Sequence, residues 1–238
     1  MTSWSSSGTT RFVGRPVPRC STRNCSSLRA GSRERGGRQP IGLRYNGIVW
    51  IEKLREKLAA LAPSVEESED WPLQAAVVLL LREVGDDLDV LLIKRIEDAR
   101  DPWSGHIALP GGRREPEDRT LWETAVRETR EEVGIDLERD GEVVGRLSPI
   151  SPSTPLLPPI RVTPLVALVR PNVEVTIGPE VERAFWVSLR ALRRQGRSER
   201  VEKLVNGEWR VWPAYPSPYG PIWGMTERIL TQLLALWE

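Results

Sequence analysis

Three glutamates in the middle of the chain stand at helical spacing. They are Glu128, Glu131 and Glu132, within the run Arg-Glu-Thr-Arg-Glu-Glu-Val-Gly that begins at Arg127. Positions i, i+3 and i+4 share one face of a helix, one turn apart. Like charges on one face repel each other unless a cation lies against them, and hard divalent cations prefer such oxygen ligands. We therefore expect these glutamates to bind a divalent metal ion, Mg²⁺ or Mn²⁺.

A glycine pair lies upstream of this helix. Pro110, Gly111 and Gly112 predict a turn that lets the backbone approach a ligand or the helix closely. A glycine-rich turn followed by a carboxylate-bearing helix is typical of metal-dependent phosphate chemistry. The simpler interpretation of Glu-x-x-Glu-Glu is a solvated helix face paired with arginine. The combination with Arg127, Gly134 and the glycine pair favours the metal site.

The same segment resembles the signature of the Nudix hydrolases, Gly-x5-Glu-x7-Arg-Glu-U-x-Glu-Glu-x-Gly-U, in which U is apolar. The second half matches at Arg127, Glu128, Glu131, Glu132, Gly134 and Ile135. Thr129 departs from the pattern at an apolar position that a methyl-bearing residue can fill. The first half is one residue longer between Gly112 and Arg127, and Asp118 replaces the first glutamate.

This longer spacing resembles the coenzyme A diphosphatase subgroup, which carries a Gly-Gly-x-x-x-Pro-x-Asp segment, here residues 111–118. The subgroup's upstream element is matched by residues 91–95, Arg100, Gly105 and residues 109–112, with Ile93 and Leu109 as departures and one additional residue between Arg100 and Gly105. Residues 223–226 are similar to its Trp-Gly-x-Thr segment. The resemblance implies hydrolysis of the pyrophosphate of coenzyme A or acyl-coenzyme A to 3′,5′-ADP and (acyl-)4′-phosphopantetheine.

Two alternatives to this activity stay open. One is a Nudix pyrophosphatase acting on ADP-ribose, NADH, dinucleoside polyphosphates or a damaged nucleotide. The other is a Nudix domain kept as a non-catalytic nucleotide-binding module. Such modules usually lose the carboxylates of the signature, and this chain retains all three.

The resemblance also implies roles for individual residues. Glu128, Glu131, Glu132 and the backbone of Gly112 are the expected metal ligands, Arg127 pairs with a carboxylate to hold the helix, and Asp118 supports it. The expected substrate-binding residues are Arg95, Arg100, Gly111, Gly112 and Arg113, with Arg114 beside them.

Other side chains have more than one interpretation. His106 is a hydrogen-bond donor to phosphate or a general base, or else a packed or solvent-facing residue. Glu180 and Glu182 are a general base, an extra metal ligand or ordinary loop acids. The rings of Trp212, Tyr215, Tyr219 and Trp223 either stack on an adenine or pack in the core.

Composition separates a leader from the body of the chain. Residues 1–48 carry nine arginines against Glu34 alone and are rich in Ser, Gly and Pro, whereas the whole 238-residue chain has a net charge of only +1. This pattern predicts a disordered basic leader, and the domain that resembles the Nudix hydrolases is then expected over residues 49–238. The leader is a transit peptide, a polyanion-binding tail, a flexible extension, or the result of a mis-assigned translation start. Its cysteines, Cys20 and Cys25, lack the neighbours of a metal site.

We expect no membrane segment in the body of the chain. Its longest apolar run, residues 75–81, is far shorter than the ~20 residues of a membrane span. We expect a cytoplasmic enzyme, or a mitochondrial one if the leader is a transit peptide. The expected partner is a small nucleotide, not a nucleic acid or a membrane, and the family makes a homodimer plausible.

Apolar periodicity predicts an α/β or α+β fold. Helices are expected over residues 50–61, 121–133 (closed by Gly134) and 225–236. Strands are expected over residues 75–81, 90–93, 106–109, 143–147, 162–169, 184–189 and 209–212, and residues 149–159 form a proline-rich loop. The resemblance implies the Nudix α/β/α sandwich, a mixed sheet between helices.

Overall fold

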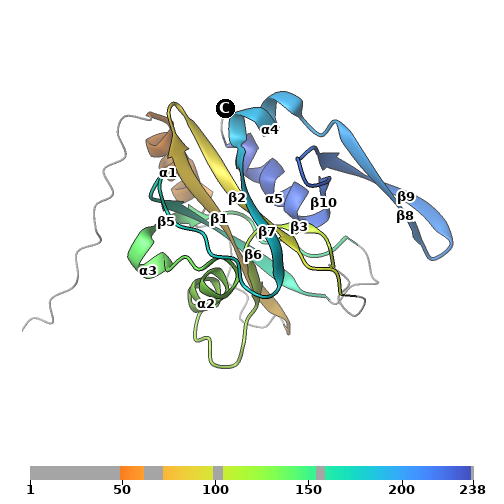
Figure 1. The fold of residues 1–238 in the computed structure, drawn as a ribbon, viewed down its shortest axis with the longest axis horizontal. Coiled ribbons are helices and arrows are strands. Elements are labelled where there is room, and N and C mark those ends of the chain that lie inside the picture. The colour runs from red at the N-terminus through yellow and green to blue at the C-terminus, as the bar shows by residue number, and fades with distance from the viewer. Residues whose placement is uncertain (1–48, 62–71, 99–103, 154–158, 237–238) are drawn as a thin grey trace, which may run out of the picture. The chain divides into compact units, whose positions relative to one another are not determined.

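A mixed seven-stranded sheet forms the centre of the fold in the computed structural model (Figure 1). The structure describes residues 49–61, 72–98, 104–153 and 159–236. The basic leader with both cysteines, and Arg100, therefore lie outside the described residues.

The strand order places two early strands in the middle of the sheet. It runs β3 (Ile107–Ala108), β2 (Asp87–Arg95), β1 (Gln74–Val84), β6 (Arg161–Val169) and β5 (Gly141–Arg146), with β4 (Gly111–Arg113) also pairing β1 and β7 (Val181–Ser188) pairing β2. β1 and β6 are parallel, and the remaining pairs are antiparallel. This arrangement confirms the predicted mixed sheet.

β1 is apolar over residues 75–81, where both of its faces are packed against other parts of the fold. Leu79 and Leu81 pack toward one core together with α1 (Val49–Leu61), α4 (Leu189–Gln195) and α5 (Gly224–Ala235). Val78 and Leu80 pack toward a second core on the opposite face, with α2 (Leu121–Val133) and α3 (Leu137–Asp140). The sheet therefore lies between two helical layers, as the predicted sandwich requires (Figure 1).

The carboxylate-bearing helix α2 has the bounds that the sequence predicts. At its N-terminus, Thr120 is the cap, and its side chain accepts a hydrogen bond from the backbone of Glu123. At its C-terminus, Gly134 adopts a left-handed conformation with φ of 69°, and its N–H donates to the carbonyl of Arg130. Both ends of α2 are thus set by the capping residues that flank it.

A three-stranded sheet in the order β10 (Ile222–Trp223), β9 (Glu208–Tyr215) and β8 (Glu199–Val205) adjoins the main sheet. β8 and β9 form a hairpin whose turn residues, Asn206 and Gly207, have φ of 53° and 81°. Positive φ at both turn positions is the geometry that the right-handed twist of a hairpin favours. Figure 1 shows this hairpin extending away from the main sheet.

The sequence did not predict α3, α4, β4, β8 or β10. One of the turns that it predicted is wrong. The glycine pair that was expected to form a turn is strand β4, in which Gly111 pairs with Val77 and Gly112 with Ala76. The absence of side chains lets this strand press against β1. The expected close approach of the backbone is therefore real, but an extended segment makes it.

None of the helices in the described parts of the chain is long and apolar enough to span a membrane.

Replacing Thr129 by Val should stabilise the protein. Thr129 fills the apolar position of α2, is fully buried, and its hydroxyl lacks a hydrogen-bond partner among the described residues. Removing an unsatisfied buried hydroxyl while keeping the shape of the side chain should raise the free energy of unfolding by about 1 kcal/mol. Chemical denaturation measures this change.

Thr124 provides the matched control. It is equally buried in the same helix, but its hydroxyl donates to the carbonyl of Thr120 at 3.4 Å. Thr124→Val should therefore give no gain in stability. An equal gain in both variants would contradict the explanation.

Candidate active site

The backbone of β4 lies directly against two carboxylates of α2. The N–H of Gly111 donates to Oε2 of Glu132 at 2.8 Å. A Cβ at Gly111, where φ is +142°, would stand 2.2 Å from the carbonyl oxygen of Ala76, and a Cβ at Gly112 would stand 2.4 Å from Oε1 of Glu128. A side chain at Gly111 would meet backbone atoms of β1, and a side chain at Gly112 would displace the carboxylate of Glu128, which explains the glycine pair.

Arg127 connects the carboxylates to the preceding loop. Its Nη1 donates to Oε1 of Glu128 at 2.9 Å and to Oε2 of Glu131 at 3.3 Å. Its Nη2 donates to Oδ2 of Asp118 and to the carbonyl of Arg113, both at 3.0 Å. The guanidinium of Arg127 therefore connects the carboxylates of α2 to both ends of the loop over residues 113–118.

Asp118 is the inner anchor of that loop. It is buried, and its carboxylate accepts both from Arg127 and from the backbone N–H of Glu115 at 3.0 Å. The hydrogen bond from Arg127 is the main reason why the pKa of Asp118 lies below its usual value. The loop that is one residue longer than the general Nudix signature thus ends in an ion pair between the buried Asp118 and the partly buried Arg127.

Burial makes two of the glutamates weaker acids. Desolvation raises the pKa of Glu132 to about 7, against the lowering effect of the hydrogen bond from Gly111. Desolvation also raises the pKa of Glu128, although Arg127 partly offsets it, and the charge of Glu131 adds to the rise. Both carboxylates therefore lack sufficient positive charge around them, which is the electrostatic setting of a cation site.

Glu131 lies on the outer side of the cluster. Its side chain is 59% exposed. It borders a surface hollow of about 250 Å³ lined by Glu123, Val126, Arg127, Arg130, Glu131 and Glu138. The cluster is thus open to solvent at Glu131 and closed at Glu132.

Arg95 and Glu180 complete the surroundings of Glu132. Nη1 of Arg95 lies 3.3 Å from Oε1 of Glu132, and Nη2 lies 3.5 Å from Oε2 of Glu180. The negative charge of Glu180 contributes to the raised pKa of both Glu128 and Glu132. Glu182, in contrast, pairs with Lys94 at 2.8 Å. Of these two acids, the structure brings Glu180 to the carboxylates.

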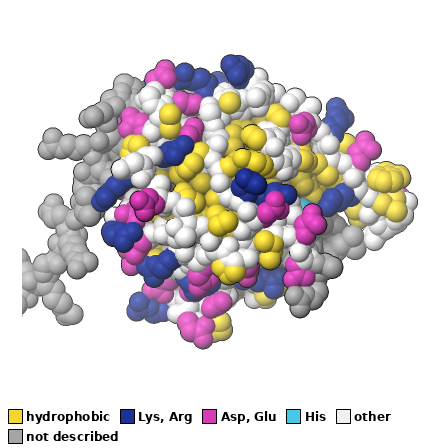
Figure 2. All heavy atoms as spheres, in the orientation of Figure 1, with side chains coloured by type: hydrophobic (Ala, Val, Ile, Leu, Met, Phe, Trp, Pro, Cys, Tyr) yellow, Lys and Arg dark blue, Asp and Glu magenta, His cyan; other side chains and the backbone are white. Residues whose placement is uncertain are grey.

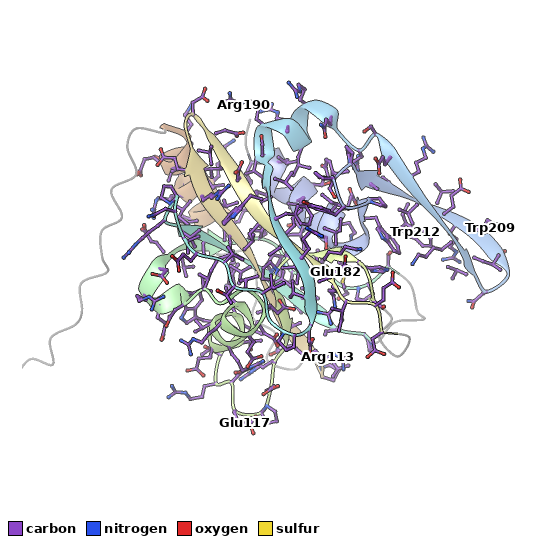
Figure 3. All side chains as sticks on the ribbon, viewed as in Figure 1. Arg113, Glu117, Glu182, Arg190, Trp209 and Trp212 are labelled. Atoms are coloured by element: carbon purple, nitrogen blue, oxygen red, sulfur yellow. The ribbon has the colours of Figure 1, made fainter. Side chains whose placement is uncertain are left out.

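The remaining predicted site residues differ in their positions relative to the carboxylates. Arg113 is exposed beside the cluster (Figure 3), whereas Arg114 holds the loop through the carbonyls of Asp118 and Arg119. His106 contacts Lys203, at 3.3 Å, and the ring of Trp223. Arg100 lies outside the described residues.

The four aromatic residues that the sequence suggested for adenine stacking differ in burial. Tyr215 is buried, and its hydroxyl pairs with Thr231 at 3.0 Å, so it belongs to the core. Tyr219 is 41% exposed and packs edge-on against Phe185. Trp212 and Trp223 lie with ring centroids 5.7 Å apart and are partly exposed.

The donor set suits a hard cation. Among the described residues, no three His, Cys, Asp or Glu side chains are grouped closely enough to enclose a metal ion. Instead, Arg127 supplies the positive charge between Glu128 and Glu131. The desolvated carboxylates of Glu128 and Glu132 and the adjacent backbone of Gly112 are nevertheless the hard oxygen donors that Mg²⁺ and Mn²⁺ prefer.

Gly111→Ala should destabilise the fold. The new methyl group would meet backbone atoms of Ala76 and Val77, which cannot move without disrupting β1. We expect the free energy of unfolding to fall by about 3 kcal/mol or more. Gly85→Ala is the control, because Gly85 also has positive φ but nothing lies within 4 Å of its added Cβ. A loss at Gly111 no larger than that at Gly85 would show that the close approach is unimportant.

In the absence of divalent cations, stability should fall as the pH rises from about 5 to 8. The pKa of Glu132 is about 7 in the folded state against 4.5 when exposed. Between these values the folded state binds more protons than the unfolded state, so raising the pH disfavours folding. Denaturation in EDTA at several pH values measures the slope.

Glu132→Gln should reduce this pH dependence, because glutamine stays neutral and can still accept from Gly111. Glu123→Gln is the control. The pKa of Glu123 is lowered, mainly by a hydrogen bond from the backbone of Arg119, so it titrates below this range. If Glu132→Gln keeps the full slope, the desolvation of Glu132 is not its cause.

Comparison with known proteins agrees with this geometry. Residues 71–206 match the NUDIX domain family. The chain is 31% identical to the uncharacterized Nudix hydrolase NudL of Citrobacter koseri over 191 residues, which are 79% of this chain and 95% of the relative. It is 30% identical, over the same shares of the two chains, to the protein of that name from Cronobacter sakazakii.

Among solved structures, a MutT/nudix family protein from Enterococcus faecalis is similar with a TM-score of 0.46 and 19% identity, covering 77% of this chain and 70% of the other. The family match extends over more than half of the chain, and the NudL proteins align over nearly their whole length. The chain therefore belongs to the Nudix hydrolases and is a Nudix pyrophosphohydrolase.

Proposed function

We propose that this enzyme hydrolyses the pyrophosphate of coenzyme A or acyl-coenzyme A, with Mg²⁺ or Mn²⁺, to 3′,5′-ADP and (acyl-)4′-phosphopantetheine. The observation that carries the proposal is the ion pair between the buried Asp118 and the partly buried Arg127. Asp118 belongs to the longer segment that resembles the coenzyme A diphosphatases, and Arg127 belongs to the general Nudix signature. Their pairing gives the subgroup spacing a structural role at the site itself.

Glu128, Glu131, Glu132 and the carbonyl of Gly112 are the residues that would hold the metal. When bound, the metal would neutralise charge on the phosphates and make a water molecule a better nucleophile. The protein's part is to place the donors. Arg127 orients Glu128 and Glu131, while the N–H of Gly111 orients Glu132.

Charged residues around the carboxylates provide the remaining functions. Glu180 lies beside Arg95 at the edge of the cluster, where its carboxylate can accept a proton from the attacking water. Arg95 and Arg113 can donate to phosphate oxygens. The water oxygen bonds to phosphorus as the anhydride P–O bond breaks, and the second phosphate leaves.

The alternative substrates are ADP-ribose, NADH, dinucleoside polyphosphates and damaged nucleotides. A non-catalytic nucleotide-binding module is the alternative of a different class. Three carboxylates, two of them desolvated, favour hydrolysis over binding alone, because a site that only binds an anion gains nothing from clustered negative charge.

A substrate panel tests the proposal. The full chain with Mg²⁺ or Mn²⁺ is incubated with coenzyme A, acyl-coenzyme A, ADP-ribose, NADH and diadenosine polyphosphates, and products are separated by chromatography. Preference for coenzyme A or its acyl derivative, with release of 3′,5′-ADP, is expected. Preference for another substrate would contradict the substrate assignment, and absence of any turnover would favour the binding module.

Glu131→Gln should lower the turnover number by about two orders of magnitude or more, since each tenfold change corresponds to about 1.4 kcal/mol and a metal supplies several. Glutamine keeps the size of the side chain at this exposed position, so stability should change little. Glu117→Gln is the control, because Glu117 is an exposed residue of the preceding loop (Figure 3). Equal activity of Glu131→Gln and the wild type would exclude Glu131 from the metal site.

A further inference from the structure

A group of aromatic and basic side chains lies where β3 meets the three-stranded sheet. It consists of His106, Lys203, Trp212 and Trp223, which we call the aromatic–basic cluster. The ring of His106 meets that of Trp223 edge-on, with centroids 4.7 Å apart, and the ring of Trp212 lies 5.7 Å from that of Trp223. On the face shown in Figure 2, hydrophobic side chains gather beside lysine and arginine side chains toward the hairpin.

Two contacts hold the charge of Lys203 in place. Its Nζ lies 3.3 Å from Nε2 of His106 and 4.6 Å above the ring of Trp223. Because an ammonium group can only donate, Nε2 of His106 must be the acceptor in this contact. Lys203 is nevertheless exposed, so a ligand can reach its positive charge.

The cluster adjoins the carboxylate site through one pair of neighbouring residues. The N–H of Arg95 donates to the carbonyl of His106 at 3.1 Å, in line with the antiparallel register of β2 and β3. Residues directly opposite each other on paired strands lie about 5 Å apart and share a face of the sheet. Arg95 in turn contacts Glu132. The aromatic–basic cluster therefore continues the surface on which the phosphates are expected.

The hairpin presents two different faces. Trp212 is opposite Val201 in the register of β8 and β9, so it shares a face with Lys203, two residues from Val201. Trp209 is opposite Leu204 on the other face and is 71% exposed. Figure 3 shows Trp212 nearer the main sheet and Trp209 toward the end of the hairpin. The face that carries Lys203 and Trp212 is the one that meets His106.

We propose that the aromatic–basic cluster binds the nucleotide half of the substrate, an inference that rests on the proposed function. The exposed parts of the Trp212 and Trp223 rings stack against the nucleobase, and Lys203 pairs with a phosphate on the ribose. Flat apolar rings suit any nucleobase, so the charge of Lys203 supplies the selectivity. The ligand class is a purine nucleotide with a phosphate in addition to the one that is cleaved.

Binding of two product-like nucleotides tests this assignment. Calorimetry with the full chain in EDTA, where no turnover occurs, gives the Kd of 3′,5′-ADP and of 5′-AMP. Trp212→Ala should weaken both by about tenfold, because the stacking surface is lost. Lys203→Ala should weaken 3′,5′-ADP by about tenfold and 5′-AMP little, because only the former carries the additional phosphate. Lys203→Arg should keep the preference.

Two variants on the opposite face of the same hairpin are matched controls. Trp209→Ala removes an exposed tryptophan, and Arg200→Ala removes a positive charge on the side that faces away from His106. Both should bind the nucleotides like the wild type. Thermal unfolding of all five variants checks that the fold is retained.

The outcomes separate this inference from the proposed function. If Trp212→Ala and Lys203→Ala bind both nucleotides like the wild type, or if the controls lose as much, the inference is wrong. Hydrolysis of coenzyme A by the wild-type enzyme would then leave the proposed function intact. If the variants lose binding as expected but another nucleotide is the preferred substrate, the subsite stands and the substrate assignment fails.

Discussion

The close approach of the Gly111–Gly112 backbone to α2 is the constraint on which the site depends. β4 pairs with β1, and in doing so it brings one N–H to Glu132 and leaves no space between Gly112 and Glu128. The sheet thus sets the position of the helix carboxylates directly, without an intervening layer of side chains. A side chain at Gly111 would push β4 away from β1, and a side chain at Gly112 would displace the carboxylate of Glu128.

Positive charge is distributed unevenly around the three glutamates. Arg127 neutralises the outer side of the cluster and pairs with Asp118. Glu132 is buried, and it contacts the N–H of Gly111 and one guanidinium nitrogen of Arg95. Burial therefore dominates the pKa of Glu132. A buried carboxylate such as that of Glu132 destabilises the protein in the absence of a cation and is stabilised when a cation binds. The same residue can therefore contribute to metal binding and lower the stability of the metal-free protein.

The second sheet is anchored by a buried carboxylate of its own. Glu227, in α5, accepts from Arg197 at 3.3 Å and from Thr231 at 2.9 Å, and Thr231 also pairs with Tyr215 at the end of β9. Because a buried charge must be paired, this network holds the chain entering β8, the end of β9 and α5 together. The base of the hairpin is thereby positioned next to β3, where Lys203 meets His106.

The sequence alone determined the bounds of α2, the three glutamates on one face, and the central strand of the sheet, because helix caps, helical spacing and an apolar run are local signals. Ser188, which caps α4, and Gly196, which ends it, could have revealed that helix. Tertiary structure decided the rest. The glycine pair is extended only because β1 is available to pair with it, and Glu180 rather than Glu182 reaches the carboxylates because of strand pairing. Contacts between residues distant along the chain depend on how elements pack, and spacing in the sequence does not encode that packing.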